Sequence, residues 1–304
     1  MKIAFPFLIR GLPALTASLL LAACAMGKSA PAEAADVCAK RGEAGSAEIR
    51  YGDDDRSYRY FVPESEGKLP LVVAMHGGLG TGEAMAEQTG MDAAAERHGF
   101  AVVYPNGSWR SWNAGKCCGR AASTNVDDVG FIRTLTRELG KAECIDGDRV
   151  YGTGFSNGAM LAHRIACEAP EVFDAIAPVA GGPMIDNCPD KPAIPALLMV
   201  GRKDERIPWD GGIFDETYRP SIAEQVKALA QRNGCDSEEA KVAGNAGVCA
   251  QRKGCRKGAL RWCVIDGVGH QWPGGKTIMQ RLLGPNRNVV DATDTILRFF
   301  KEQK

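Results

Sequence analysis

The segment Gly154–Gly158 (GFSNG) constrains this chain more than any other feature. It follows the apolar run Val150–Thr153, which predicts a strand, and it opens Gly158–Glu168, whose apolar residues have helical spacing. A strand that reverses directly into a helix strains the backbone of the central serine, and glycines on both sides avoid collisions. The turn lifts the hydroxyl to a helix N-terminus, where N–H groups favour negative charge. The pattern predicts that Ser156 is a nucleophile.

Apolar runs and helical segments alternate along the rest of the chain. The runs that predict strands are Tyr58–Val62, Leu71–Met75, Ala101–Tyr104, Val150–Thr153, Ala175–Val179, Ala196–Val200 and Leu260–Ile265. The segments that predict helices are Gly82–His98, Val126–Leu139, Gly158–Glu168, Ser221–Asn233 and Asp291–Lys301. This alternation predicts an α/β fold, and with the serine elbow an α/β-hydrolase fold: a mostly parallel central sheet with helices on both faces, over residues 46–304 as a single domain.

The N-terminus has the pattern of an export signal. Lys2 and Arg10 precede the apolar stretch Gly11–Ala23, which is too short to span a membrane. The stretch closes at Cys24 with a sequence that resembles a bacterial lipobox. We expect residues 1–24 to be a signal peptide, residues 25–45 a solvated tether, and the only membrane attachment to be a lipid at Cys24. Ordinary cleavage after residues 32–34 is the alternative, and on both readings the chain is exported: an outer-membrane or cell-surface lipoprotein, or else a secreted or periplasmic protein.

Cysteine usage agrees with export. Eleven cysteines are present, and ten remain once Cys24 is lipidated or removed. An even number in an exported chain indicates disulfides, five at most. No pair has the C-x-x-C spacing of structural zinc sites, so no metal is expected. We expect the neighbours Cys117 and Cys118 to take different partners, and Cys38 to pin the end of the tether.

Charge narrows the range of ligands. Lysine and arginine together number 37, and aspartate and glutamate also number 37, so the formal net charge is zero. A nucleic-acid-binding surface needs a basic excess that this chain lacks. A small neutral substrate fits better, and no nucleic-acid partner is expected.

A serine needs a base, and the chain contains four histidines. His76 stands in a His-Gly-Gly turn suited to shaping a loop, His98 ends a predicted helix, and His163 lies on the helix after the serine. His270 follows the predicted strand Leu260–Ile265, at the late position that α/β-hydrolases give to the base. His270 is therefore the candidate base.

The imidazole in turn needs a carboxylate to orient it. By chain order this acid should follow the strand after the elbow helix and precede His270. Asp204 meets both conditions and is the candidate; Glu205, Asp210 and Asp215 are its rivals.

An acyl-transfer site also needs two N–H donors for the developing oxyanion. The residue after the nucleophile, Asn157, supplies one. The glycine-rich turn after the strand Leu71–Met75 offers the other, with Gly78 as the candidate and Gly77 as alternate, although a plain tight turn would show the same glycines.

Tryptophans near these residues are candidates for substrate contact. Trp209 lies close to Asp204, Trp272 lies close to His270, and Trp112 stands with Trp109 in the loop that carries the cysteine pair. Core packing is an equally good explanation for each.

Several motifs together resemble a known family. They are the runs 75–78 (MHGG), 104–107 (YPNG), 112–119 (WNAGKCCG), 126–131 (VDDVGF), 154–158 (GFSNG) and 269–274 (GHQWPG). As a set they are similar to the exported polyhydroxybutyrate depolymerase and feruloyl esterase group, which is related to carbohydrate esterase family 1. The resemblance covers residues 71–275 and implies a serine esterase that hydrolyses feruloyl or acetyl esters of polysaccharides, or short hydroxyalkanoate esters, through an acyl-enzyme without a cofactor.

Two other functions remain open at this point. The first is a serine peptidase on the same fold, and the second is a surface-binding lipoprotein that lacks catalysis. Arg202 and Lys203 stand directly before Asp204, where the family usually has a small polar residue, and this difference makes an anionic ester or an acidic polysaccharide conceivable as a substrate.

Overall fold

The computed structural model describes Met1 and residues 36–186, 188, 192–242, 249–256, 258–287 and 290–303. The predicted signal, Cys24 and the first half of the predicted tether lie outside the described residues, apart from Met1. Within the described ranges, no helix has the length and apolar character needed to cross a membrane.

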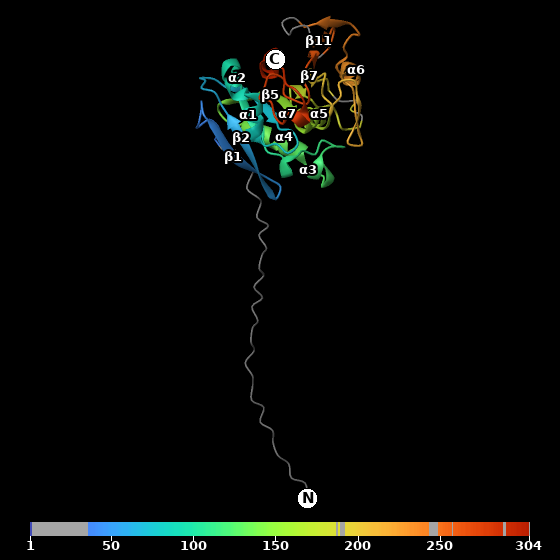
Figure 1. The fold of residues 1–304 in the computed structure, drawn as a ribbon. Coiled ribbons are helices and arrows are strands. Elements are labelled where there is room, and N and C mark those ends of the chain that lie inside the picture. Colours follow the sequence, from blue (N-terminus) through green and yellow to red (C-terminus); the bar gives the residue numbers. More distant parts are fainter. Residues whose placement is uncertain are drawn as a thin grey trace. The chain divides into compact units, whose positions relative to one another are not determined.

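In the described part of the chain, ten strands form one sheet in the order β1-β2-β4-β3-β5-β6-β7-β12-β11-β10 (Figure 1). Their bounds are β1 Ala44–Tyr51, β2 Asp54–Phe61, β3 Leu69–Met75, β4 Ala101–Pro105, β5 Ile145–Phe155, β6 Ala175–Val179, β7 Ala196–Gly201, β10 Glu239–Lys241, β11 Cys249–Arg252 and β12 Leu260–Ile265. A separate hairpin pairs β8 Gly212–Phe214 with β9 Thr217–Arg219.

The six central strands are parallel, and only the strands at the two edges pair antiparallel. Every residue of β3, β4, β6 and β7 is buried, as expected for strands covered on both faces. All seven predicted strands are present, and β6 and β12 have the predicted bounds. The predicted α/β-hydrolase architecture is confirmed.

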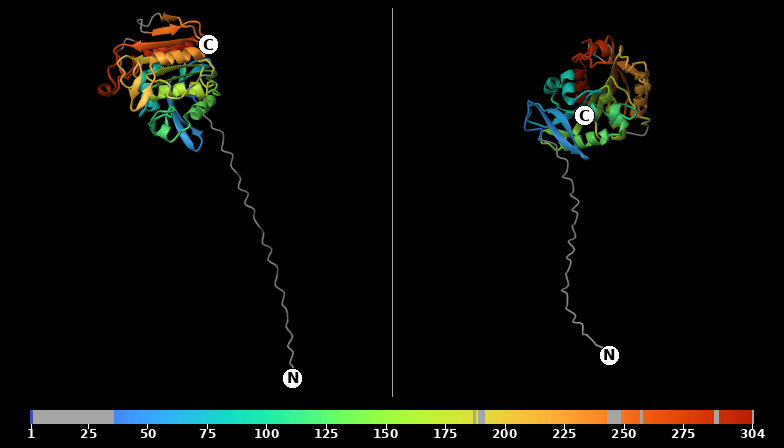
Figure 2. Two further views of the ribbon diagram at one scale, coloured as in Figure 1. Left: turned by 90° about the vertical axis from the view of Figure 1, so that its right-hand side faces the viewer. Right: turned by 60° about the horizontal axis from the view of Figure 1, so that its bottom comes forward.

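Helices cover both faces of the sheet (Figure 2). Their bounds are α1 Gly82–Thr89, α2 Met91–His98, α3 Gly119–Ser123, α4 Asp128–Leu139, α5 Asn157–Glu168, α6 Ile222–Asn233, α7 Gln280–Leu283 and α8 Ala292–Lys301, with a short 3₁₀ turn η1 Ser108–Arg110. Helices α4, α5 and α6 pack on one face of the sheet, and α1, α2 and α8 pack on the other. Alternate residues of one strand therefore enter different cores. Val73 lies in the core under α4, α5 and α6, and Val72 lies in the core under α1, α2 and α8.

The single helix predicted over Gly82–His98 is wrong. The structure divides it into α1 and α2 at Gly90, which has the left-handed φ of 59° and donates its N–H to Ala86 O. Glycine reaches this conformation without a steric penalty, so the helix ends there and a second begins.

The predicted tether also extends too far. Val37 is buried, Cys38 is disulfide-bonded to Cys144, and β1 already begins at Ala44. Residues 36–45 therefore belong to the folded domain, and the prediction that Cys38 pins this end is confirmed.

Five disulfides account for the ten cysteines. They are Cys38–Cys144, Cys117–Cys118, Cys167–Cys188, Cys235–Cys255 and Cys249–Cys263. The expectation that Cys117 and Cys118 take different partners is wrong, because they pair with each other across a cis peptide bond. The other eight cysteines are already paired among themselves, so none is left for either of the two neighbours.

Candidate active site

Ser156 stands at the turn between β5 and α5. Its φ of 53° and ψ of −116° lie in a region that residues with a side chain rarely adopt, and its N–H donates to Val179 O at 2.9 Å. A Cβ on Gly154 would lie 2.5 Å from the Gly158 carbonyl carbon, and a Cβ on Gly158 would collide with Met75 O. Both glycines of the elbow are therefore required by close backbone contacts.

The structure brings the three predicted polar residues into one hydrogen-bonded line. His270 Nε2 lies 2.8 Å from Ser156 Oγ, and His270 Nδ1 lies 2.8 Å from Asp204 Oδ2. All three stand beyond the carboxyl ends of parallel strands, namely β5, β7 and β12, where α/β sheets gather their reactive groups. The ring of Phe155 packs beside the imidazole at 4.9 Å between centroids.

Asp204 is held from its other side. Its Oδ1 accepts the backbone N–H groups of Arg206 at 2.9 Å and of Ile207 at 2.8 Å, and its side chain is fully buried. These two bonds leave Oδ2 for the imidazole, so the aspartate cannot rotate without losing them. The rivals Glu205, Asp210 and Asp215 are exposed and make no hydrogen bond to His270 in the described part of the chain.

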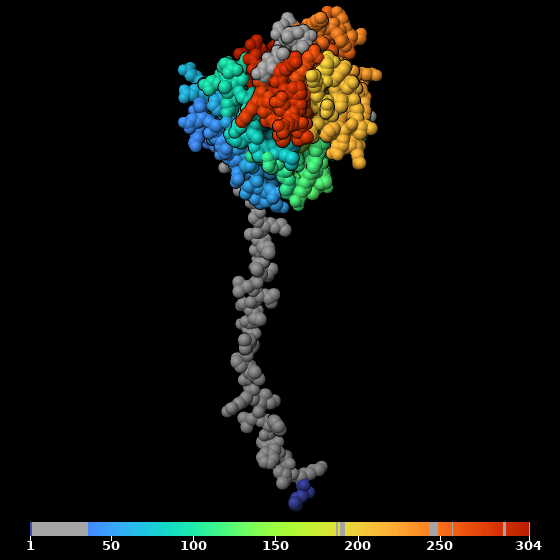
Figure 3. Space-filling model, viewed as in Figure 1, coloured from blue at the N-terminus to red at the C-terminus, as the bar shows by residue number. Residues whose placement is uncertain are grey.

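Loops from distant parts of the chain meet around this line. Lys203 N–H donates to Val268 O, His270 N–H donates to Leu283 O, and Lys276 N–H donates to Gln88 O. Figure 3 shows the same arrangement on the surface, where the red segment after β12 lies beside the teal segment around α1 and the yellow segment after β7.

Of the two predicted oxyanion donors, Asn157 directly follows the serine and Gly78 lies on the turn after β3. Asn157 is the first residue of α5, and its backbone N–H has no acceptor among the described residues; the same holds for the N–H of Gly78. Gly77, the alternate, lies closer to the serine, because a Cβ there would come within 3.4 Å of Ser156 Cβ. A free donor at Asn157 therefore stands next to Ser156, and the free donor at Gly78 directly follows Gly77, which adjoins the serine.

His76 shapes the turn that carries Gly78. Its Nδ1 lies 2.7 Å from Gly77 O, and its Nε2 accepts the N–H of Gly107 at 3.0 Å, so the network requires a neutral ring with the proton on Nδ1. Burial lowers the pKa of His76 to about 4, which keeps the ring neutral at pH 7. The role predicted for His76 as a loop-shaping residue is confirmed.

The loop of the cysteine pair is fastened to the elbow helix. Asn157 Oδ1 accepts the Trp112 N–H at 2.7 Å, and Asn157 Nδ2 donates to Trp112 O at 3.0 Å. The buried Asp128 accepts the N–H of Asn113 and pairs with Arg56 at 2.9 Å. This buried ion pair was not anticipated from the sequence; the adjacent aspartates of the 126–131 motif were its only signal.

Two of the three tryptophan predictions are wrong. Trp112 and Trp272 have no exposed surface, and their Nε1 groups donate to His76 O and to Thr293 Oγ1. A side chain without exposed surface cannot touch a substrate, so both are core residues. Trp209 is half-buried beneath the guanidinium of Arg202, which also pairs with Asp266 at 2.6 Å.

A nucleophile elbow on a mostly parallel sheet, with a histidine and an aspartate supplied by later strands, defines the α/β-hydrolase class. Solved structures agree on the fold. The acetyl xylan esterase from Aspergillus awamori matches with a TM-score of 0.57 and 18% identity over 84% of this chain and 99% of its own. A feruloyl esterase module from Clostridium thermocellum matches with a TM-score of 0.56 and 14% identity over 87% of this chain and 90% of its own.

Sequence relatives identify the family. The family model described as Esterase PHB depolymerase matches residues 56–206. The protein NocK of Nocardia uniformis subsp. tsuyamanensis, whose name assigns it provisionally to the esterases, is 33% identical over 272 residues, which is 80% of this chain and 78% of that protein. Feruloyl esterase B of Piromyces equi is 29% identical over 68% of this chain and 40% of its own length. The chain belongs to the PHB depolymerase esterase family, and it is a carboxylic-ester hydrolase.

Proposed function

We propose that this protein is an exported serine esterase in which Ser156 is the nucleophile, His270 the general base and Asp204 the residue that orients the base. The observation that carries this proposal is the unbroken line of hydrogen bonds from Asp204 through His270 to Ser156, with 2.8 Å at each step. In a triad the carboxylate fixes the imidazole tautomer so that the unprotonated nitrogen faces the serine.

The reaction has two halves. His270 Nε2 accepts the Ser156 proton while Oγ attacks the ester carbonyl, and the protonated imidazole then gives that proton to the departing alcohol. The products of this half are the free alcohol and an acyl-serine. Water, which gives a proton to the same imidazole, then attacks the acyl-serine to form a tetrahedral intermediate. When this intermediate breaks down, the carboxylic acid leaves and the imidazolium returns the proton to Ser156 Oγ.

The oxyanion formed in both halves is stabilised by the backbone N–H groups of Asn157 and Gly78. Both donors are free of other acceptors in the described residues, so neither has to break a bond when charge develops. The strained backbone of Ser156 supports its role as nucleophile, because the elbow conformation directs Oγ away from the backbone and toward the substrate.

Esters of feruloyl or acetyl groups on polysaccharides, or short hydroxyalkanoate esters, are the proposed substrates. Relatives whose names include feruloyl esterase and poly(3-hydroxyalkanoate) depolymerase support this range. Five disulfides support export, since such bonds persist in oxidising compartments. The lipobox sequence before Cys24 supports a lipid anchor there.

Hydrolysis of a small ester panel tests the proposal. Purified wild type and Ser156→Ala are compared on p-nitrophenyl acetate, p-nitrophenyl butyrate, methyl ferulate and a hydroxybutyrate oligomer, with folding checked by circular dichroism. We expect turnover by the wild type and a loss of roughly 10⁴-fold or more in kcat for the variant. Equal activity of the two proteins would refute Ser156 as nucleophile.

Mass spectrometry of the mature N-terminus tests the anchor separately. A diacylated or triacylated Cys24 as the first residue is expected. A free N-terminus downstream of Cys24 would contradict lipidation and leave ordinary secretion.

A further inference from the structure

Trp109 is unusual in both backbone and exposure. Trp109 has a φ of 51° and Arg110 a φ of 59°. Both angles lie in the left-handed region that bulky residues seldom occupy. The conformation is held because Arg110 O accepts the N–H of Leu79, itself at φ 63°, at 2.7 Å. Trp109 is 52% exposed, and the Arg120 guanidinium lies 4.4 Å from the centroid of its ring. Backbone strain of this kind clusters at functional positions, so the exposed ring of Trp109 is a candidate for ligand contact.

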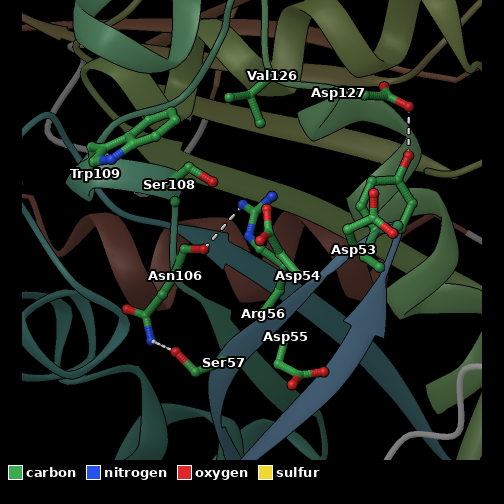
Figure 4. Close-up of a pocket in the computed structure, with 13 residues that line it drawn as sticks. Asp53, Asp54, Asp55, Arg56, Ser57, Asn106, Ser108, Trp109, Val126 and Asp127 are labelled. Atoms are coloured by element: carbon green, nitrogen blue, oxygen red, sulfur yellow. Dashed lines mark hydrogen bonds between the residues drawn. The ribbon is translucent and has the colours of Figure 1, made fainter. Parts of the chain in front are cut away.

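A hollow of about 610 Å³ opens beside this ring (Figure 4). Three segments line it. They are the end of β1, the turn and the start of β2 at residues 51–57, the loop after β4 at residues 106–109, and residues 126–127 before α4. Most of the side chains that Figure 4 labels around it are polar, and Trp109 is among the residues that line it. Its volume suits a ligand the size of a few sugar rings.

The charged side chains of the hollow that lack an ion-pair partner among the described residues are acidic. Arg56 is neutralised by the buried Asp128 at 2.9 Å. Asp127 already accepts from Gly130 N–H and Tyr51 O–H. Asp53 and Asp54, at the hairpin turn, have no ion-pair or hydrogen-bond partner among the described residues, so their oxygens are open acceptors. Both residues are exposed, so their carboxylates are available to a ligand that carries hydrogen-bond donors, whereas an anionic ligand would be repelled.

The hollow is attached to the turn that carries the proposed oxyanion donor. Gly107, on its lining, donates its N–H to His76 Nε2 at 3.0 Å. His76 directly precedes Gly77, where a Cβ would come within 3.4 Å of Ser156 Cβ. The loop that carries Trp109 is therefore hydrogen-bonded to the turn that carries Gly78, through Gly107 to His76 and through Arg110 to Leu79.

We propose that Trp109 and the hollow beside it form a subsite for an uncharged sugar chain, the alcohol portion of the ester substrate. The inference rests on the proposed function and specifies its substrate class. A sugar ring offers an apolar C–H face to the indole and hydroxyl donors to Asp53 and Asp54, which accept but cannot donate. The negative charge of the hollow favours a neutral polysaccharide over the acidic one that Arg202 and Lys203 made conceivable.

Hydrolysis with and without a sugar tests the subsite. Wild type, Trp109→Ala, Trp109→Tyr and the control Ile213→Ala, another exposed apolar residue, are compared on p-nitrophenyl acetate and on acetylated xylohexaose. For Trp109→Ala we expect kcat/KM on p-nitrophenyl acetate within twofold of wild type and a loss of about 5- to 30-fold on the oligosaccharide, mostly through KM. Trp109→Tyr should retain most of the oligosaccharide activity, and Ile213→Ala all of it. Equal losses on both substrates, or no loss on the oligosaccharide, would overturn the proposal.

Binding without catalysis separates this inference from the proposed function. Ser156→Ala is titrated with unesterified xylohexaose, monitored by calorimetry, and compared with Ser156→Ala/Trp109→Ala and Ser156→Ala/Asp54→Asn. The two double variants should bind about 5- to 30-fold more weakly than the single variant. Absence of binding to Ser156→Ala at millimolar concentration, or unchanged affinity in the double variants, would refute the subsite even if the ester panel establishes Ser156 as nucleophile.

Discussion

Asp204→Asn is the substitution whose outcome depends most directly on the hydrogen bonds around the triad. The side chain keeps its size, but one oxygen becomes an N–H₂ group. The backbone N–H groups of Arg206 and Ile207 both donate to Oδ1, so the amide oxygen must stay there. The N–H₂ group is then directed at His270 Nδ1, which must become an acceptor and move its proton to Nε2.

A proton on Nε2 faces Ser156 and removes the base. For the same substitution in a triad of this geometry the loss in kcat is about 10⁴-fold, which corresponds to roughly 5 kcal/mol of transition-state stabilisation. We expect a loss of this size on p-nitrophenyl acetate at pH 7.5, with KM changed little.

The matched control is Asp210→Asn, on the same loop but exposed. It should retain wild-type kcat, and both variants should unfold in denaturant near the wild-type midpoint. If Asp204→Asn retained more than a tenth of wild-type kcat, or if Asp210→Asn lost as much, the assignment of Asp204 as the orienting acid would be wrong.

Three further outcomes follow from the structure. Replacing both Cys38 and Cys144 by serine opens a link across 106 residues and should lower the free energy of unfolding by about 4 to 5 kcal/mol in a urea titration; a loss under 1 kcal/mol would contradict the pairing. Burial lowers the pKa of His163 from 6.5 to about 4, so the unfolded chain protonates first and the stability that neutral His163 contributes is present above pH 6.5 and lost as the pH falls toward 4. Between pH 7 and pH 4.5 the free energy of unfolding should therefore fall by roughly 2 kcal/mol less in His163→Leu than in wild type. Parallel curves of unfolding free energy against pH for the two proteins would contradict this. Arg219 is buried with no described carboxylate within 4 Å, and burial lowers its pKa, so Arg219→Met should leave stability within about 1 kcal/mol of wild type or raise it; a large loss would reveal a partner for the charge.

The fold and the candidate triad could be predicted because their signals are local. Apolar runs mark buried strands regardless of what packs on them, and β6 and β12 have the predicted bounds. The close backbone contacts of Gly154 and Gly158 arise from the elbow itself. Chain order then selected His270 and Asp204, because right-handed crossovers place successive strand ends along one edge of the sheet.

Other features depended on contacts between distant segments, and only the tertiary structure decided them. Trp272 stands near His270 in sequence and Trp112 lies in the loop of the cysteine pair, but both point into the core, since a loop can direct a side chain to either side. The division of the helix at Gly90 reflects the choice of one backbone conformation that glycine permits but does not require.

The sequence by itself determined the class of chemistry. Ser156 has a glycine two residues away on either side at a strand-to-helix turn, and this pattern allows the serine few other conformations. The sequence did not determine the surroundings of that serine. The hydrogen bonds between Trp112 and Asn157, the burial of Trp272 and the Leu79–Arg110 hydrogen bond beside Trp109 each depend on packing between segments far apart in the chain. Short-range steric constraints depend only on neighbouring residues, so a local pattern reveals them. Contacts across the fold depend on how whole loops pack together, and no local pattern predicts that packing.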